Sequence, residues 1–197
     1  MERLPRSDHK GYGPSSSNFT TLTVSTKEPL EEAERATLLR SFDQFPDDLD
    51  KFTTRIFYST GCHPWSLAHP DRANWKIVSG ADGTYLTYLR AKTYEQTRLV
   101  MDPGVEPWIE AFLEEELGHS EHEYARRVRR WAEKAGLSGM TPRTLRHDCI
   151  YRFLREFDWN LVYAVATFGT DARTLVGYAS RHGIALQYGR LRMGAFK

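Results

Sequence analysis

The apolar residues of this 197-residue chain change their spacing in its middle third, which limits the folds that it can adopt. On both sides of residues 75–101, apolar side chains recur three or four positions apart, the period of an amphipathic helix. The middle instead carries short β-branched and aromatic runs separated by turn-forming segments. These runs are Trp75–Val78, Thr84–Arg90 and Arg98–Met101. We therefore expect a mostly helical α+β fold with one small three-stranded antiparallel sheet.

Capping signals indicate where the helices begin and end. A first helix is expected after Ser25-Thr26, and a second is expected to stop at Gly61. Residues 120–123 (SEHE) have the spacing of a capping box, and Thr141-Pro142 combines an N-cap with a proline in the first turn. From the second onward, helices are predicted at 47–59, 107–117, 120–134, 141–157, 159–168 and 171–182. The segment 159–168 is apolar on most sides and is therefore expected to be buried.

Length and composition are typical of one packed domain. Hydrophobic residues make up 40% of the chain, and no apolar run approaches the length of about 18 residues that a membrane span needs. Residues 1–24 are polar and lack the apolar stretch of a signal peptide. We expect a tail or linker there, one domain over residues 25–197, and a soluble cytoplasmic protein with no membrane partner. The two cysteines, Cys62 and Cys149, exclude a disulfide scaffold.

The charges are distributed unevenly although their sum is only +1. Eight acidic residues and no basic ones lie between Asp102 and Glu123, whereas residues 124–155 hold nine basic residues and two acidic ones. A basic C-terminal third is typical of a face that binds nucleic acid, and a solvated helix surface is the simpler alternative. The candidate DNA-binding residues are Arg126, Arg127, Arg130, Arg173 and Arg181.

One helix start concentrates groups that bind anions. Arg143, Arg146 and His147 follow Thr141-Pro142 with spacing i, i+3 and i+4, so they project from one face of the first turn. A helix N-terminus also attracts negative charge. The pattern favours a phosphate site, although surface arginines beside a half-buried histidine would give the same spacing.

Residues 141–147 (TPRTLRH) resemble the second conserved box of the tyrosine recombinase (phage integrase) family, Thr-Pro-His-x-Leu-Arg-His. Further segments follow in that family's order: 60–67 (TGCHPWSL), Lys92-Thr93 between the second and third expected strands, 168–170 (FGT) and 174–178 (TLVGY). The resemblance spans about residues 27–190 and implies the fold of the family's catalytic domain. The family's N-terminal clamp domain is expected to be absent from this chain.

The resemblance implies metal-free phosphoryl transfer. In this family a tyrosine attacks a DNA phosphodiester and forms a 3′-phosphotyrosine link, without a cofactor. The matching positions make Tyr178 the nucleophile, Arg146 one of the arginines that hold the non-bridging oxygens, and Lys92 the general acid. Double-stranded DNA is the implied partner, with a dimer or tetramer of this chain assembled on it. DNA integration and an origin in a virus or other mobile element are further implications.

Several positions depart from the family pattern. His63 stands where the first arginine belongs, Arg143 replaces the histidine of the second box, and Thr170 replaces that of the third. His147, the last residue of the second box, is retained and would assist proton transfer. Losing one preorganised donor typically costs about 10²–10³-fold in rate. We expect a degenerate active site in which Arg143 could supply the missing positive charge.

The sequence leaves alternatives open. The first is site-specific strand cleavage and exchange; the second is a catalytically impaired homologue that binds DNA as a regulatory or architectural protein; the third keeps the fold for protein contacts only. His119 and His122 have a spacing that could ligate a metal, but the capping box explains that segment more simply. No metal or cofactor is expected.

Overall fold

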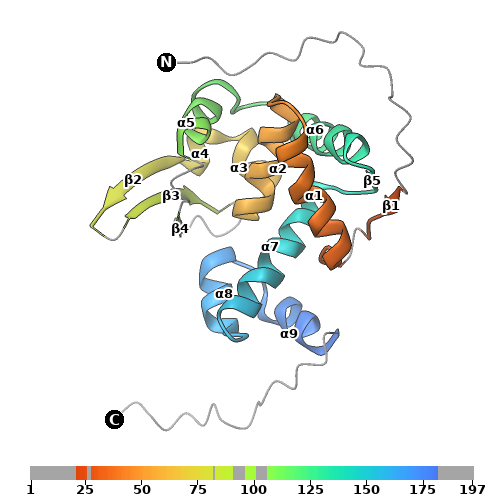
Figure 1. Cartoon of the computed structure of the whole chain (residues 1–197). Coiled ribbons are helices and arrows are strands. Elements are labelled where there is room, and N and C mark those ends of the chain that lie inside the picture. The colour runs from red at the N-terminus through yellow and green to blue at the C-terminus, as the bar shows by residue number, and fades with distance from the viewer. Residues whose placement is uncertain (1–20, 26–27, 82, 91–95, 101–105, 182–197) are drawn as a thin grey trace, which may run out of the picture.

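Figure 1 shows the computed structural model of the chain, which describes residues 21–25, 28–81, 83–90, 96–100 and 106–181. The elements occur in the order β1 (Leu22–Thr23), α1 (Glu32–Gln44), α2 (Leu49–Thr60), α3 (Pro64–Ala68), α4 (Pro70–Ala73), β2 (Lys76–Gly80), β3 (Gly83–Leu89), β4 (Gln96–Val100), α5 (Glu106–Glu115), α6 (Glu121–Lys134), β5 (Leu137–Ser138), α7 (Pro142–Glu156), α8 (Leu161–Phe168) and α9 (Ala172–Arg181).

The predicted three-stranded antiparallel sheet is present. The strands β2, β3 and β4 pair in chain order, with Val78 opposite Tyr85 and Tyr85 opposite Val100. The sheet extends to one side of the helices in Figure 1. It was predictable because short β-branched runs with turn-length connections favour local antiparallel pairing.

Two hydrophobic clusters form the core, and α7 contributes to both. The larger cluster lies among α1, α2 and α6 and includes Phe57, Tyr124 and Trp131. The smaller one joins α7 to α8 and α9 through Ile150 and Leu154. In Figure 1, α8 and α9 lie at one end of α7, apart from the other helices. One continuous helix therefore positions the two parts of the fold relative to each other.

Two predictions about the helices are wrong. The first helix begins at Glu32 and not after Ser25-Thr26, because Glu31 and Glu34 cap it reciprocally; Thr26 itself lies outside the described residues. The segment 159–168 is only partly buried: Ala164 and Phe168 are buried, whereas Val162 is 72% exposed and Tyr163 is 46% exposed. The eight-residue helix α8 packs against α7 and α9 on one side only, so its opposite face meets solvent.

The structure also contains a pairing that the sequence pattern did not predict. Residues Leu22–Thr23 form a two-stranded parallel sheet with Leu137–Ser138, and Val24 is buried in the larger cluster. Leu22, Thr23 and Val24 all fall within the range 1–24 that we expected to be a tail. Strands of two residues carry no detectable period. The contact therefore depends on the folded arrangement of α1 and α6.

Candidate functional site

A cleft of about 840 Å³ lies where the two parts of the fold meet, bordered by α3, α6, α7, α9 and the end of β3. Its lining includes five of the six predicted catalytic side chains: His63, Arg143, Arg146, His147 and Tyr178. These residues come from positions up to 115 apart in the sequence, so the fold brings them together. The sixth, Lys92, lies outside the described residues.

The first turn of α7 holds three of these side chains in one place. Thr141 caps the helix by accepting the amide proton of Thr144 at 3.2 Å, and the Thr144 hydroxyl accepts the amide proton of Thr141 at 3.3 Å. Pro142 occupies the first helical position, where its missing N–H costs nothing. This start agrees with the predicted N-cap. It fixes the directions of Arg143, Arg146 and His147.

Arg146 binds the ends of two other helices. Its guanidinium donates to the carbonyl of Gly61, which follows α2, and to the carbonyl of Phe168 at 2.8 Å. It also donates to the hydroxyl of Thr170 at 3.1 Å. The carbonyls at a helix C-terminus carry partial negative charge, so a cation is favourable there. Arg146 therefore has a structural role as well as a place in the cleft.

Arg90 is a cleft residue that the sequence reasoning missed. It follows β3, is only 7% exposed, and donates to the carbonyl of Val165 at 3.1 Å. Burial lowers its pKa, and the positive charge of Arg146 lowers it further. The available sequence signal was a single arginine at the end of an otherwise apolar β-run. Such an arginine on its own indicates the edge of a sheet rather than a functional site.

Tyr178 and His147 pack against each other in the lining of the cleft. Tyr178 is fully buried on α9, and its ring meets the His147 ring edge-on at 5.5 Å between centroids. Burial lowers the pKa of His147 to about 4, helped by the charges of Arg143, Arg146 and Arg181. Its Nε2 accepts from Arg143 Nε at 3.3 Å. At neutral pH the imidazole is therefore uncharged.

His63 lies on the rim of the cleft and caps α3. Its Nδ1 accepts the amide proton of Trp65 at 3.2 Å and lies 3.9 Å from a carboxylate oxygen of Glu121. A histidine carries a positive charge only when protonated on both ring nitrogens. Because Nδ1 accepts the hydrogen bond from Trp65, it carries no proton in this arrangement, so His63 does not reproduce the fixed charge of an arginine.

The predicted DNA-binding cluster on α6 has acidic partners within the chain. Arg126 lies 2.6 Å from Glu123, Arg127 is buried between Glu123 and Glu116, and Arg130 binds Asp50 at 2.6 Å. None of the three arginines lines the cleft. Ion pairing reduces the positive potential that the sequence alone suggested. DNA binding by this cluster stays a prediction.

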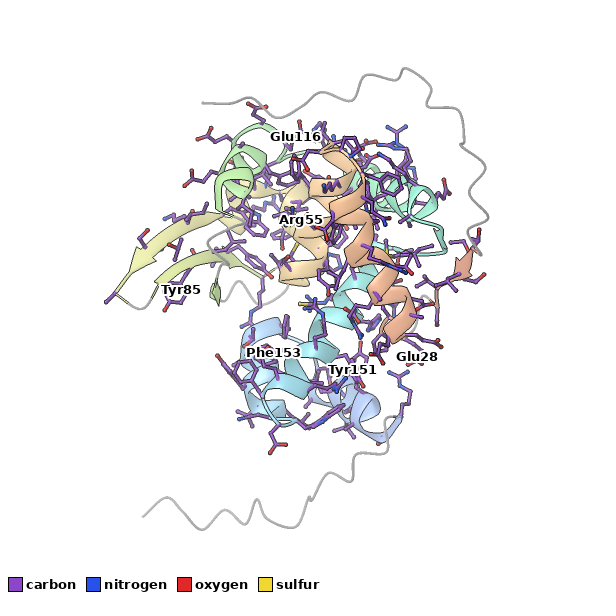
Figure 2. The ribbon with its side chains drawn as sticks, in the orientation of Figure 1. Glu28, Arg55, Tyr85, Glu116, Tyr151 and Phe153 are labelled. Carbon is purple, nitrogen blue, oxygen red and sulfur yellow. The ribbon has the colours of Figure 1, made fainter. Side chains whose placement is uncertain are left out.

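The two predicted DNA-binding arginines of α9 differ in setting. Arg173 is 94% exposed in its side chain and lies 3.4 Å from Asp171. Arg181 binds Glu28 at 2.8 Å and stacks over the Tyr178 ring at 5.2 Å. In Figure 2, Glu28 lies near the end of α9. This ion pair ties the segment before α1 to the helix that carries Tyr178.

The described part of the chain holds neither a candidate metal site nor a candidate membrane span. Within it, no group of three or more His, Cys, Asp or Glu side chains could hold a metal ion. His119 instead pairs with Glu116 at 3.3 Å, and Ser120 caps α6 through the amide of Glu123. Over the same residues, every helix is too short or too polar to cross a bilayer.

Comparison with known proteins shows similarity in fold. No family model matches the sequence, and no curated protein matches it. Two solved structures of XerH site-specific recombinase bound to difH substrates do match: the post-cleavage complex with the palindromic substrate has a TM-score of 0.60 at 14% identity, and the pre-cleavage complex has 0.59 at 15%. Each match covers 80% of this chain and 50% of the recombinase chain, so this chain spans about half the length of those proteins. The chain shares the fold of that part of XerH.

Proposed function

We propose that this chain is a DNA-binding protein of the tyrosine recombinase type, and that Tyr178 cleaves DNA through a 3′-phosphotyrosine intermediate. The observation that carries the proposal is the meeting of Tyr178 with Arg143, Arg146 and His147 in one cleft. The similarity in fold to a recombinase crystallised with its DNA substrate supports it. The order of the sequence motifs supports it independently.

The proposed reaction balances without a metal or a nucleotide. The Tyr178 oxygen bonds to phosphorus, the 5′-oxygen of the next nucleotide leaves, and the phosphodiester energy is kept in the protein–DNA link. Neutral His147 accepts the tyrosine proton at Nε2 once Arg143 has left this nitrogen for the DNA phosphate, and Arg146 stabilises the negative charge on the phosphoryl oxygens. The sequence motifs alone assign the protonation of the leaving 5′-oxygen to Lys92.

The nucleophile must move before it can react. Tyr178 is fully buried, and Leu175 and Ala179 of the same helix are also buried. The Glu28–Arg181 ion pair holds the end of this helix. We propose that DNA binding displaces α9 enough to bring the Tyr178 oxygen to phosphorus.

A second candidate function has specific support. His63 caps α3 and faces Glu121, while Arg146 already donates to two carbonyls and a hydroxyl. An active site whose side chains already make these contacts would cleave slowly or not at all. The alternative is therefore a homologue that binds DNA in a regulatory or architectural role without cutting it.

DNA affinity tests the part that both candidates share. We expect the chain to bind double-stranded DNA in fluorescence anisotropy with a log–log salt slope near −4 to −5, for about five phosphate contacts. Arg143→Gln should make the slope shallower by about one. Arg155→Gln is the matched control, because Arg155 is exposed at the other end of the same helix and outside the cleft lining. Undetectable or salt-independent binding would overturn both candidates.

A further inference from the structure

The cleft contains more fixed positive charge than the sequence motifs account for. Arg90, Arg143 and Arg146 all line it, and they come from two separate parts of the chain. Arg143 is exposed on the first turn of α7, whereas Arg90 is almost fully buried after β3. Two guanidiniums from separate elements, those of Arg90 and Arg146, therefore line the same cleft as the Arg143 side chain.

The loop after α8 is shaped around the Arg90 guanidinium. Gly169 ends α8 with φ of +60°, and a Cβ atom at this residue would lie 2.8 Å from Arg90 Nη1. Arg90 donates to the carbonyl of Val165, and Arg146 donates to the carbonyl of Phe168 in the same last turn. The two guanidiniums thus hold the same helix end, and both reach the cleft.

His63 does not carry the permanent charge that Arg90 carries, because an imidazole is charged only when both of its ring nitrogens hold a proton. Its Nδ1 is occupied by the Trp65 amide, and Glu121 lies beside the ring. A guanidinium, in contrast, keeps its charge at all physiological pH values and presents a fork of N–H donors that matches phosphate oxygens. The described cleft therefore has a buried arginine at a position that the family pattern does not mark.

We propose that Arg90 and Arg146 together bind the non-bridging oxygens of a phosphate group in this cleft. The identification of that phosphate as part of DNA rests on the proposed function; binding of a phosphate group by Arg90 does not. The competing interpretation is that Arg90 only caps the C-terminus of α8. The two interpretations differ in whether loss of the Arg90 charge weakens the binding of a phosphate ion.

The test uses inorganic phosphate with the 197-residue chain at constant ionic strength. Phosphate is titrated while the Nε–H signals of the arginines are followed by NMR, with assignment by single substitutions. In the wild type we expect the Arg90 and Arg146 signals to shift together. In Arg90→Gln, which is polar but shorter and uncharged, we expect the Kd to rise at least about tenfold. Arg155→Gln should retain the wild-type Kd.

Two further variants keep the test decisive if Arg90→Gln folds poorly. Arg90→Lys retains the charge without the fork and should weaken phosphate binding by about threefold. Gly169→Ala leaves Arg90 in the sequence but displaces its guanidinium, and should also weaken binding. The proposal is overturned if the wild type shows no shift at Arg90, or if both of these variants and Arg90→Gln bind phosphate with the wild-type Kd.

The outcome is separable from that of the proposed function. Phosphate binding through Arg90 without any affinity for double-stranded DNA would leave this inference standing and overturn the DNA-binding proposal. Salt-dependent DNA binding, with phosphate affinity unchanged in the Arg90 variants, would overturn this inference and leave the DNA-binding proposal standing.

Discussion

The Tyr178 ring packs edge-on against the His147 ring, and each contributes a buried polar atom that has no hydrogen-bond partner among the described residues: Tyr178 Oη and His147 Nδ1. A buried polar group without a partner costs free energy, of the order of 1–3 kcal/mol. Such a cost is typical of functional sites, where groups are kept for chemistry and not for stability. This pair is the basis of the first two predictions.

Removing the Tyr178 hydroxyl should not destabilise the fold. Tyr178→Phe deletes an unpaired buried oxygen, so we expect the free energy of unfolding to stay unchanged or rise by up to about 1 kcal/mol in urea denaturation. Tyr124→Phe is the matched control, because the Tyr124 hydroxyl donates to the carbonyl of Glu116 at 2.7 Å. It should lose about 1–2 kcal/mol. Equal losses in the two variants would mean that the Tyr178 hydroxyl has a structural partner.

Stability should depend on pH through His147. Its pKa is about 4 in the folded protein, below the ordinary value of 6.5. Between these pH values the unfolded chain binds a proton that the folded chain does not. The lowered pKa of His147 therefore contributes in full to the free energy of unfolding above about pH 6.5. This contribution is lost as pH falls toward 4.

His147→Gln removes this contribution and supplies the measurement. The difference in unfolding free energy between wild type and His147→Gln should shrink from pH 7 to pH 4 by the order of 1 kcal/mol, after allowance for solvent screening. His69→Gln is the control, since His69 is exposed and outside the cleft lining. A pH-independent difference for His147→Gln would contradict the lowered pKa.

A buried carboxylate next to His147 should be essential for stability. Asp148 is fully buried and binds Arg35 at 2.5 Å and Arg152 at 2.9 Å, which ties α7 to α1. Asp148→Asn keeps the shape but leaves two guanidiniums without their counter-charge, so we expect a loss of about 3–5 kcal/mol. Asp43→Asn, on the exposed side of α1, should change stability by less than about 0.5 kcal/mol. A loss below 1 kcal/mol in Asp148→Asn would show that the network is weak.

The glycine after α2 should tolerate no side chain. Gly61 has φ of +57°, and a Cβ there would lie 3.0 Å from Cys149 Cβ and Sγ. Gly61→Ala is expected to lose about 1–3 kcal/mol and to weaken phosphate binding, because the Gly61 carbonyl accepts from Arg146. Gly177→Ala, with open space around its Cβ, should be neutral or stabilising by up to about 1 kcal/mol. Thermal unfolding distinguishes the two, and a neutral Gly61→Ala would contradict the close packing.

Local signals in the sequence predicted the parts of the fold that depend on neighbours along the chain. The antiparallel sheet and the Thr141-Pro142 helix start belong to this class, because their hydrogen bonds join residues close in sequence. Five of the six side chains that the motifs singled out line the cleft, whereas Lys92 lies outside the described residues and the catalytic roles stay predictions. The start of α1 was missed because a reciprocal cap by Glu31 and Glu34 outweighs the Ser25-Thr26 signal.

Features that depend on distant partners could not be predicted. Arg130 binds Asp50, 80 positions away, so a run of arginines that looks like a nucleic-acid face is partly neutralised. Arg90 reaches the cleft only because α8 ends beside it, 75 positions later. Burial of 159–168 was overestimated because its composition does not show which neighbours are available to cover it. Charge counts and apolar fractions contain no such information.

Formation of a covalent link at Tyr178 tests the central claim most directly. The chain is incubated with nicked duplexes whose core sequence is randomised, and DNA that stays attached after denaturation is recovered. Digestion and mass spectrometry then identify the linked residue. We predict a nucleotide on the peptide that contains Tyr178, and none in Tyr178→Phe at a DNA affinity within about twofold of wild type. Salt-dependent DNA binding with no linked peptide, or a link at another residue, would contradict the claim.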